Sequence, residues 1–211
     1  MRRSQLTAVP PTHDHRLAET AGAPVVAVFG SSAGRPGEAA YEAARDCGRL
    51  LAEAGYAVAT GGYGGAMEAC SRGAADAGGR VIGVTAPAAF PERPGANPWV
   101  QVEIPARTIT ERIHLLLSGS AACLALDGSI GTLTELVMAW NLAFVAGLSG
   151  APARPVVAVG PTWAAVVAYL AEATGSDPSG VSLVADVAAA VAEVRRRVPL
   201  GPSRLSPGAD S

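Results

Sequence analysis

The sequence predicts an α/β protein of the Rossmann-like type, in which a doubly wound parallel sheet lies between two helical layers (three-layer α/β/α). Short apolar runs alternate along the chain with segments of helical pattern, as expected of repeated strand–helix units. Aromatic residues make up 5% of the chain, while Ala, Val, Leu and Gly dominate it. Small aliphatic side chains are typical of strands that are covered by helices on both faces.

The apolar runs are expected to be strands over residues 24–29, 56–60, 80–84, 100–104, 121–126 and 155–159. The segments of helical pattern are expected to be helices over residues 38–53, 66–77, 108–118, 132–146, 163–173 and 186–197. Gly55 is the expected C-cap of the first helix. The helix over 132–146 is apolar on nearly all sides, which predicts that it is buried, in part against a second subunit.

The 211 residues predict a single nucleotide-binding domain over 24–198. Residues 1–23 are polar and Pro-containing and are expected to be disordered, and the tail over 199–211 is expected to be flexible. The N-terminus has no apolar signal core, and no apolar run is long enough, without Gly and charge, to span a bilayer. We therefore expect a cytoplasmic protein with no membrane partner.

The charged and sulfur-containing residues exclude several classes of ligand, cross-link and catalytic group. The net charge of −2 predicts no general nucleic-acid surface. The three cysteines, Cys47, Cys70 and Cys123, are isolated, which indicates reduced thiols rather than a disulfide framework or a metal site. All 16 basic residues are arginine, so a Schiff-base lysine, a pyridoxal-phosphate anchor and a phosphate-loop lysine are excluded. The sequence predicts no cofactor.

Glycine-rich segments follow three of the expected strands. They cover residues 30–34, 61–65 and 128–132. The carboxyl ends of parallel strands share one edge of the sheet, so we expect these segments to converge on one ligand site. The candidate contacts in the first two segments and the helix after them are Gly30, Ser31, Ser32, Gly61, Gly62, Gly64, Gly65 and Met67.

The third segment has the composition of a phosphate cradle. Its glycines let backbone N–H groups approach an anion, and the following helix N-terminus adds unpaired donors and a partial positive charge. The candidate contacts are Gly128, Ser129, Gly131 and Thr132. The alternative is an ordinary helix start, because Thr132 followed by Glu135 fits a capping box.

The first two segments also have alternative interpretations. Gly30-Ser31-Ser32-Ala33-Gly34 matches the G-x-S-x-G turn of serine hydrolases, although the one histidine downstream, His114, lies within a helical pattern. The segment over 61–65 admits a ligand close to the backbone or packs helix on strand. Neither segment has the G-x-G-x-x-G fingerprint, and the second strand ends at Thr60 without an acid for a ribose, so NAD binding is not expected.

Two motifs together resemble the LOG (Lonely Guy) family, whose members were long named lysine decarboxylases. The family pattern is an arginine on a helix, followed by Pro-Gly-Gly-x-Gly-Thr-x-x-Glu. In this chain Arg112, within Thr110-Glu111-Arg112-Ile113, matches the first part, and residues 127–135 match the second. The resemblance covers about residues 25 to 160 and also includes residues 28–32 and 61–68.

The resemblance implies a homodimeric Rossmann-like enzyme with its site at or near the subunit interface. Such enzymes hydrolyse the N-glycosidic bond of a nucleoside 5′-monophosphate, typically AMP or a cytokinin ribotide, and release the base and ribose 5-phosphate. Glu135 is then the candidate to stabilise positive charge on the ribose, and Arg112 the candidate to orient Glu135 or assist the departing base. Without the resemblance, Arg112 is equally explained as an ion-pair partner of Glu111 or Glu135.

The chain departs from the family pattern near the expected phosphate. Asp127 and Ser129 replace the family's first Pro and second Gly, and Tyr63 replaces a Gly in the other loop. A carboxylate at Asp127 would repel a phosphate unless it points away or meets an arginine. The alternative function is therefore a binding or carrier protein of the same fold, which holds a nucleotide or a molybdenum cofactor without cleaving it.

Overall fold

The computed structural model describes residues 16–93 and 95–200. Within them, seven parallel strands form one sheet in the order β4-β3-β2-β1-β5-β6-β7. The strands are β1 (Val25–Phe29), β2 (Ala57–Thr60), β3 (Val81–Thr85), β4 (Val102–Pro105), β5 (Ala122–Ala125), β6 (Val156–Val159) and β7 (Ser182–Val184). The helices are α1 (Arg16–Ala21), α2 (Ala39–Glu53), α3 (Ala66–Asp76), α4 (Ile109–Ser118), α5 (Ile130–Leu148), α6 (Pro161–Thr174) and α7 (Val187–Arg197), with a 3₁₀ turn, η1 (Pro178–Gly180).

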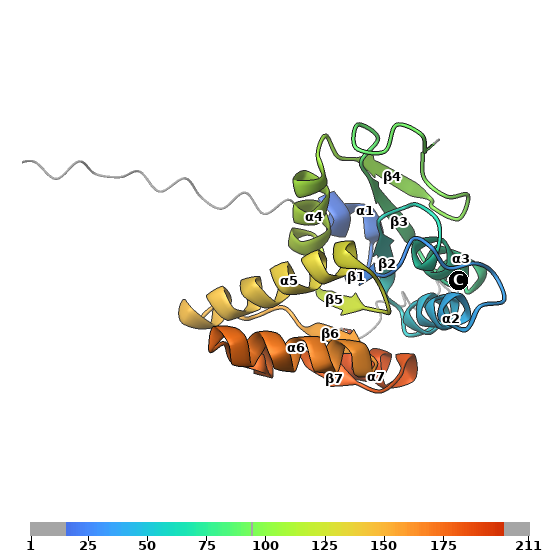
Figure 1. Ribbon diagram of the computed structural model, residues 1–211. Coiled ribbons are helices and arrows are strands. Elements are labelled where there is room, and N and C mark those ends of the chain that lie inside the picture. Colours follow the sequence, from blue (N-terminus) through green and yellow to red (C-terminus); the bar gives the residue numbers. More distant parts are fainter. Residues whose placement is uncertain (1–15, 94, 201–211) are drawn as a thin grey trace, which may run out of the picture.

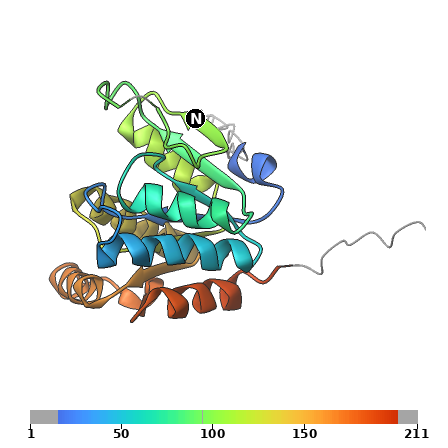
Figure 2. The same cartoon turned by 90° about the vertical axis from the view of Figure 1, so that its right-hand side faces the viewer.

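Helices cover both faces of the sheet, so the predicted α/β/α arrangement of three layers is confirmed (Figures 1 and 2). On one face α1, α4, α5 and α6 bury apolar side chains, among them Leu17, Leu116, Leu136 and Val167. On the other face α2, α3 and α7 bury a second set, among them Tyr41, Cys70 and Val191. The central strands β1, β2, β3 and β5 are buried along their whole length, which explains their continuous apolar sequence.

Helices α2 and α3 pack with their backbones in direct contact. A side chain at Gly48 would collide with the carbonyl oxygen of Cys70, and one at Gly73 would collide with the carbonyl oxygen of Arg45. The two glycines therefore set how closely the helices approach. This tight pair covers the β2 side of the sheet and fixes the loop that enters α3, which forms part of the site.

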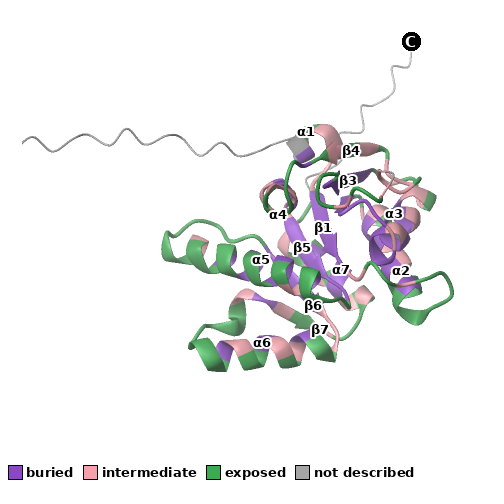
Figure 3. Cartoon of the chain, turned by 45° about the horizontal axis from the view of Figure 1, so that its top comes forward, coloured by how far each residue is buried: buried purple, intermediate pink, exposed green. Residues whose placement is uncertain are grey.

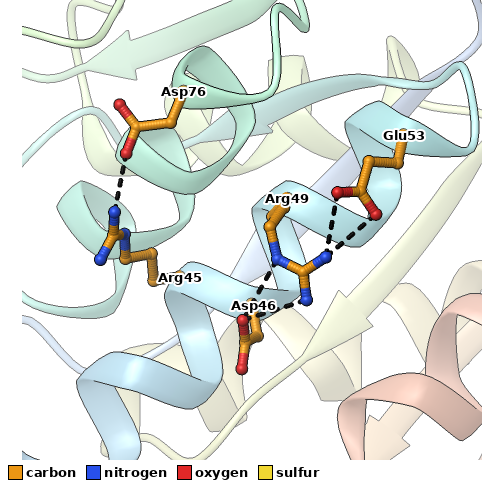
Figure 4. Close-up of polar contacts among 5 residues, drawn as sticks. All are labelled: Arg45, Asp46, Arg49, Glu53 and Asp76. Atoms are coloured by element: carbon orange, nitrogen blue, oxygen red, sulfur yellow. Dashed lines mark hydrogen bonds and ion pairs between the residues drawn. The ribbon is translucent and has the colours of Figure 1, made fainter.

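Exposed ion pairs surround this contact (Figure 4). Arg45 donates to Asp76 at 2.9 Å and so links α2 to α3. Arg49 lies between Asp46 and Glu53 on the outer face of α2, with contacts of 3.2 and 3.0 Å. Because these side chains are solvated, the pairs contribute little, and the glycine contact carries the packing.

The order of the strands creates an opening beside β1. The chain runs outward from β1 to β4, then returns to place β5 on the other side of β1. The connection after β1 leads to α2 on one face, and the connection after β5 leads to α5 on the other. Parallel sheets bind ligands at such a reversal, beyond the carboxyl ends of the strands.

The structure differs from the sequence predictions at several places. Residues 16–21, expected to be disordered, form α1, whose Leu17 is buried in the core. Residues 182–184 form the edge strand β7, which was not predicted. Helix α5 starts at Ile130 rather than Thr132. The rest of the expected N-terminal segment, 1–15, and residues 201–211 of the tail lie outside the described residues.

Helix α5 is a long apolar helix, although Gly131, Glu135 and Gly147 interrupt its apolar sequence. By length and composition it is long and apolar enough to cross a membrane, alone among the helices of the described residues. Its inner face packs on the sheet through Leu136, Ala139, Trp140 and Ala143. The core helix of a globular protein meets the same criterion, and α5 has this inner packing. Its outer face is largely exposed (Figure 3).

Candidate functional site

A cavity of about 310 Å³ lies at the carboxyl edge of the sheet, where the connections after β1 and β5 separate. This volume is within the range of small-molecule sites. The three glycine-rich segments converge there, together with α4. Nine of the predicted site residues line its wall: Gly30, Ser32, Gly61, Met67, Arg112, Ser129, Gly131, Thr132 and Glu135.

The other five predicted site residues belong to the same loops but do not line the cavity: Ser31, Gly62, Gly64, Gly65 and Gly128. The N–H of Ser31 donates to the carbonyl of Asp127 at 3.1 Å, and its carbonyl accepts from the N–H of Ala66 at 2.7 Å. These two bonds join the three loops. Gly65 has a φ of 67°, and a side chain there would meet the Ser31 carbonyl. Direct ligand contact at these five positions stays a prediction.

Arg112 on α4 and Glu135 on α5 meet in the cavity. Nη1 of Arg112 lies 3.3 Å from Oε1 of Glu135, and the two side chains are 11% and 10% exposed. Nε of Arg112 donates to the Val84 carbonyl at 2.8 Å, and Nη2 lies 3.5 Å from the sulfur of Met67. The guanidinium is thus held by three neighbours, so it presents Glu135 with a fixed orientation.

Burial shifts the pKa of both groups. It raises the pKa of Glu135 to about 7, although the nearby Arg112 acts in the opposite direction. It also lowers the pKa of Arg112, against the stabilising charge of Glu135, and the positive charge of Arg93 lowers it further. Arg112 remains charged. Glu135 can therefore take up or release a proton close to neutral pH, which is a property of catalytic carboxyl groups.

The first turn of α5 lies on the cavity wall. Ser129 is the N-cap, with an extended backbone and no side-chain capping bond, and Thr132 is buried against Gly128. The N–H groups of a first helical turn have no partner within the helix and carry the positive end of its dipole. The capping-box alternative for Thr132 and Glu135 is wrong, because Thr132 is inside the helix. Glu135 lies in the second turn and lines the cavity.

Asp127 lies off the cavity wall. Its carboxylate lies toward Gly160, 3.7 Å from the place where a side-chain carbon of that residue would stand. Gly160 is the N-cap of α6, whose positive end favours a negative charge. The carboxylate of Asp127 therefore stands off the cavity wall, and the phosphate cradle at the first turn of α5 stays a prediction.

The serine-hydrolase alternative has no partner for its nucleophile. Ser32 lines the cavity, but His114, the one histidine among the described residues, is exposed on α4 and lies off the wall. No cluster of three His, Cys, Asp or Glu side chains able to hold a metal ion occurs within residues 16–93 and 95–200. The three cysteines are free and buried, and burial raises the pKa of Cys123 to about 12.

Five residues of the wall were not among the predicted contacts: Val28, Phe29, Phe90, Arg93 and Ile130. Phe90 and Arg93 lie on the segment after β3 and line the cavity beside Arg112. The guanidinium carbon of Arg93 lies 4.3 Å from the ring centre of Phe90 and 4.6 Å from that of Tyr63. This segment is a Pro-rich loop, and a loop has no periodicity from which the direction of each side chain could be predicted.

Comparison with known proteins identifies the family. A family model described as the SLOG cluster4 family matches residues 23–158. The chain belongs to the SLOG cluster4 family. The resemblance to LOG-type proteins, inferred from the arginine and the glycine-rich motif, is thereby confirmed. This SLOG cluster4 protein is 31% identical over 108 residues to an uncharacterized protein of Archaeoglobus fulgidus, a match that covers 51% of this chain and 68% of that one.

Solved structures confirm the fold. The molybdenum cofactor binding protein of Rippkaea orientalis has a TM-score of 0.66 at 21% identity, over 82% of this chain and 96% of that chain. The molybdenum cofactor carrier protein of Chlamydomonas reinhardtii has a TM-score of 0.64 at 26% identity, over 83% and 98%. The Rossmann-like arrangement of the SLOG cluster4 protein is thus shared with cofactor-binding proteins.

Proposed function

We propose that this SLOG cluster4 protein hydrolyses the N-glycosidic bond of a nucleoside 5′-monophosphate, of the AMP or cytokinin ribotide type, and releases the free base and ribose 5-phosphate. The observation that carries the proposal is the buried pair of Arg112 and Glu135, 3.3 Å apart on the wall of a small-molecule cavity. Both residues match the LOG-type pattern, and the first turn of α5 beside them suits a phosphate.

Hydrolysis of an N-glycosidic bond requires a carboxyl group beside the ribose, and Glu135 can provide it. As the bond between C1′ and the base nitrogen breaks, positive charge grows on the ribose, and the carboxylate of Glu135 stabilises it. Water adds its oxygen to C1′, and its proton ends on the base nitrogen. With a pKa near 7, Glu135 can accept the proton from water and pass it on. Arg112 holds the carboxylate in place and is a positioning residue.

The test is a search for free base by chromatography after incubation with a panel of nucleoside 5′-monophosphates. We expect base release from the full chain and a loss of about 100-fold or more in Glu135→Gln, which keeps the side-chain volume but cannot ionise. His114→Gln is the matched control, because that exposed side chain on α4 lies off the cavity wall. Undiminished release from Glu135→Gln would reject the assignment.

The carrier alternative is favoured by one comparison. The Chlamydomonas reinhardtii protein, 26% identical over 83% of this chain, is a molybdenum cofactor carrier. A carrier would bind its ligand tightly with no turnover, so equilibrium binding measured beside base release separates the two functions. Binding of AMP without release of adenine, at any enzyme concentration tested, would favour the carrier.

We infer that the protein is a homodimer that uses the outer face of α5. Apolar side chains are exposed along this helix, from Ile130 at 76% to Leu148 at 73%, with Met138, Leu142, Phe144 and Val145 between them. A contiguous apolar surface of this kind is typical of subunit interfaces. The buried, free cysteines agree with a reducing, cytoplasmic setting.

A further inference from the structure

Tyr63 anchors the segment that follows β3. Its hydroxyl accepts a bond from the N–H of Ala86 at 2.8 Å, at the start of the segment. At the far end, the side-chain amide of Asn97 donates to the carbonyls of Gly62 and Tyr63, each at 3.1 Å, and its N–H donates to Gly62 at 2.7 Å. Both ends of the segment are therefore fixed to the loop that follows β2.

Arg93 is held above this anchor by two aromatic rings. The rings of Tyr63 and Phe90 meet edge to face, with centres 5.5 Å apart and an angle of 76°. The guanidinium carbon of Arg93 lies 4.6 and 4.3 Å from the two ring centres. Cation–π contacts at these distances restrain a guanidinium, while its N–H groups, which lie in the guanidinium plane, stay available to a ligand.

The guanidinium of Arg93 has few partners in the part of the chain that the structure describes. Among the described residues, its side chain makes no hydrogen bond, and its ion-pair contact is with Glu92 at 3.9 Å, whose side chain is 70% exposed. Arg112, in contrast, already contacts Val84, Glu135 and Met67. Of the two arginines that line the wall, Arg93 is therefore the one whose side chain makes no hydrogen bond within the described residues.

The charges on the wall favour an anion. Two guanidinium groups, Arg93 and Arg112, face one carboxyl group, Glu135, and the positive end of α5 adds to them. Asp127 lies toward Gly160 and does not line the wall. The cavity carries an excess of positive charge even when Glu135 is ionised. A phosphate monoester would balance that excess.

We propose that Arg93 is the residue that recognises the phosphate of the ligand, together with the first-turn amides of α5, and that Phe90 and Tyr63 position it. The identity of the ligand as a nucleoside 5′-monophosphate rests on the proposed function. Arg93 then determines specificity: it makes the site prefer the monophosphate over the nucleoside. Recognition of the phosphate is thereby divided between the Pro-rich segment after β3, which carries Arg93, and the turn over 127–129 that leads into α5.

The experiment measures equilibrium binding of AMP and of adenosine by calorimetry to the full chain carrying Glu135→Gln, so that the proposed hydrolysis does not consume AMP; the variants below are made in this background. Arg93→Ala should weaken AMP binding about 10- to 100-fold, the usual range for a charge-assisted hydrogen bond, and leave adenosine binding unchanged. Arg72→Ala is the matched control: Arg72 also lies over an aromatic ring, 5.4 Å from the centre of Trp99, but it does not line the cavity. It should alter neither affinity.

The positioning role of Phe90 has its own readout. Phe90→Ala should lower the ratio of AMP affinity to adenosine affinity, and Phe90→Tyr should restore it, because a tyrosine ring offers the same face to the guanidinium. A merely structural effect of the truncation would weaken both ligands together. That result would remove Phe90 from the proposal.

The outcomes distinguish a failure of the inference about Arg93 from a failure of the proposed hydrolase activity. An unchanged AMP-to-adenosine ratio in Arg93→Ala overturns the inference, whether or not base is released. AMP binding that is lost in Arg93→Ala, with no base released by the unaltered chain, supports the inference and rejects the hydrolase. Equal affinity of the Glu135→Gln protein for AMP and adenosine, or no binding of AMP at all, overturns the inference as well.

Discussion

The guanidinium of Arg112 lies in the space that a side chain at Gly61 would occupy. A glycine after β2 is therefore required by the arginine of α4, and the two residues are 51 positions apart in the sequence. The same guanidinium holds Glu135, so the glycine loop controls the carboxyl group through Arg112.

Gly61→Ala should displace Arg112 and reduce base release by a factor close to that of Arg112→Ala. The added methyl group would overlap Nη2, so the guanidinium must move and break the contacts of Nη1 with Glu135 and of Nη2 with Met67. Gly64→Ala is the control from the same loop, because its nearest neighbour would be 3.9 Å away and it does not line the cavity. Steady-state rates of the two variants decide the matter, and equal rates would contradict the role given to Gly61.

The rate of base release should rise with pH through about 7. The proposed step needs the carboxylate of Glu135, whose pKa is raised to about 7 by burial. A profile of kcat/KM from pH 5 to 8.5 should therefore show a rising limb with its midpoint near that value. Glu135→Gln should lose the limb together with the activity. A profile that falls with pH over this range would mean that the protonated acid is the active form.

Stability should fall as pH rises from about 5 to 8. The pKa of Glu135 is raised from 4.5 to about 7, so in this range the folded protein holds a proton that the unfolded chain releases. This contribution is fully present below pH 4.5, is lost as pH rises through 7, and is on the order of 3 kcal/mol.

Urea unfolding at several pH values, compared between the unaltered chain and Glu135→Gln, isolates this effect. The difference in unfolding free energy between the two proteins should change with pH between 5 and 8 and be flat above 8. No change of that difference across the range would show that Glu135 titrates normally.

Gly48→Ala should destabilise the protein by about 2 kcal/mol or more, because its methyl group would collide with the backbone of α3 at Cys70. Gly147→Ala, in α5, is the opposite case: nothing lies within 4 Å of the added carbon, and alanine favours a helix by about 0.5–1 kcal/mol. Thermal unfolding of the two variants should therefore move in opposite directions. A Gly48→Ala variant as stable as the unaltered chain would contradict the contact.

Light scattering should give the mass of a homodimer, and Leu142→Glu combined with Val145→Glu should give the mass of one chain. Both side chains are about half exposed on the outer face of α5, and charge there opposes burial against a second copy. Circular dichroism checks that the variant is folded. A single chain at high concentration of the unaltered protein would remove the dimer from the proposal.

Most of the fold could be predicted because its strands are continuous apolar runs. Strand β7 was missed since it is three residues long, only partly buried, and follows the turn η1. The start of α5 was misplaced because Thr132 and Glu135 imitate a capping box, whereas the helix begins earlier at Ile130 with Ser129 as its cap. Local sequence patterns cannot distinguish a helix that starts at Ile130 from one that starts at Thr132, because the two differ in their tertiary contacts.

The sequence predicted those residues of the candidate site that belong to a motif with fixed spacing. Arg112 and Glu135 match a spaced motif, and the structure brings them together. Gly65 and Ser31, predicted as ligand contacts, lie against each other and join the loops, because glycine density indicates a close approach without saying what approaches. Arg93 was missed because its place depends on how Tyr63 folds the segment after β3.

Helix α5 begins at the cavity, where Ser129 and Glu135 stand, and ends among the exposed apolar side chains near Leu148. At about 1.5 Å per residue its 19 residues form a rod roughly 28 Å long. A rigid rod cannot tilt at one end alone. Pairing of two chains along α5 would accordingly couple occupancy of one site to the other, and cooperative binding would be its signature.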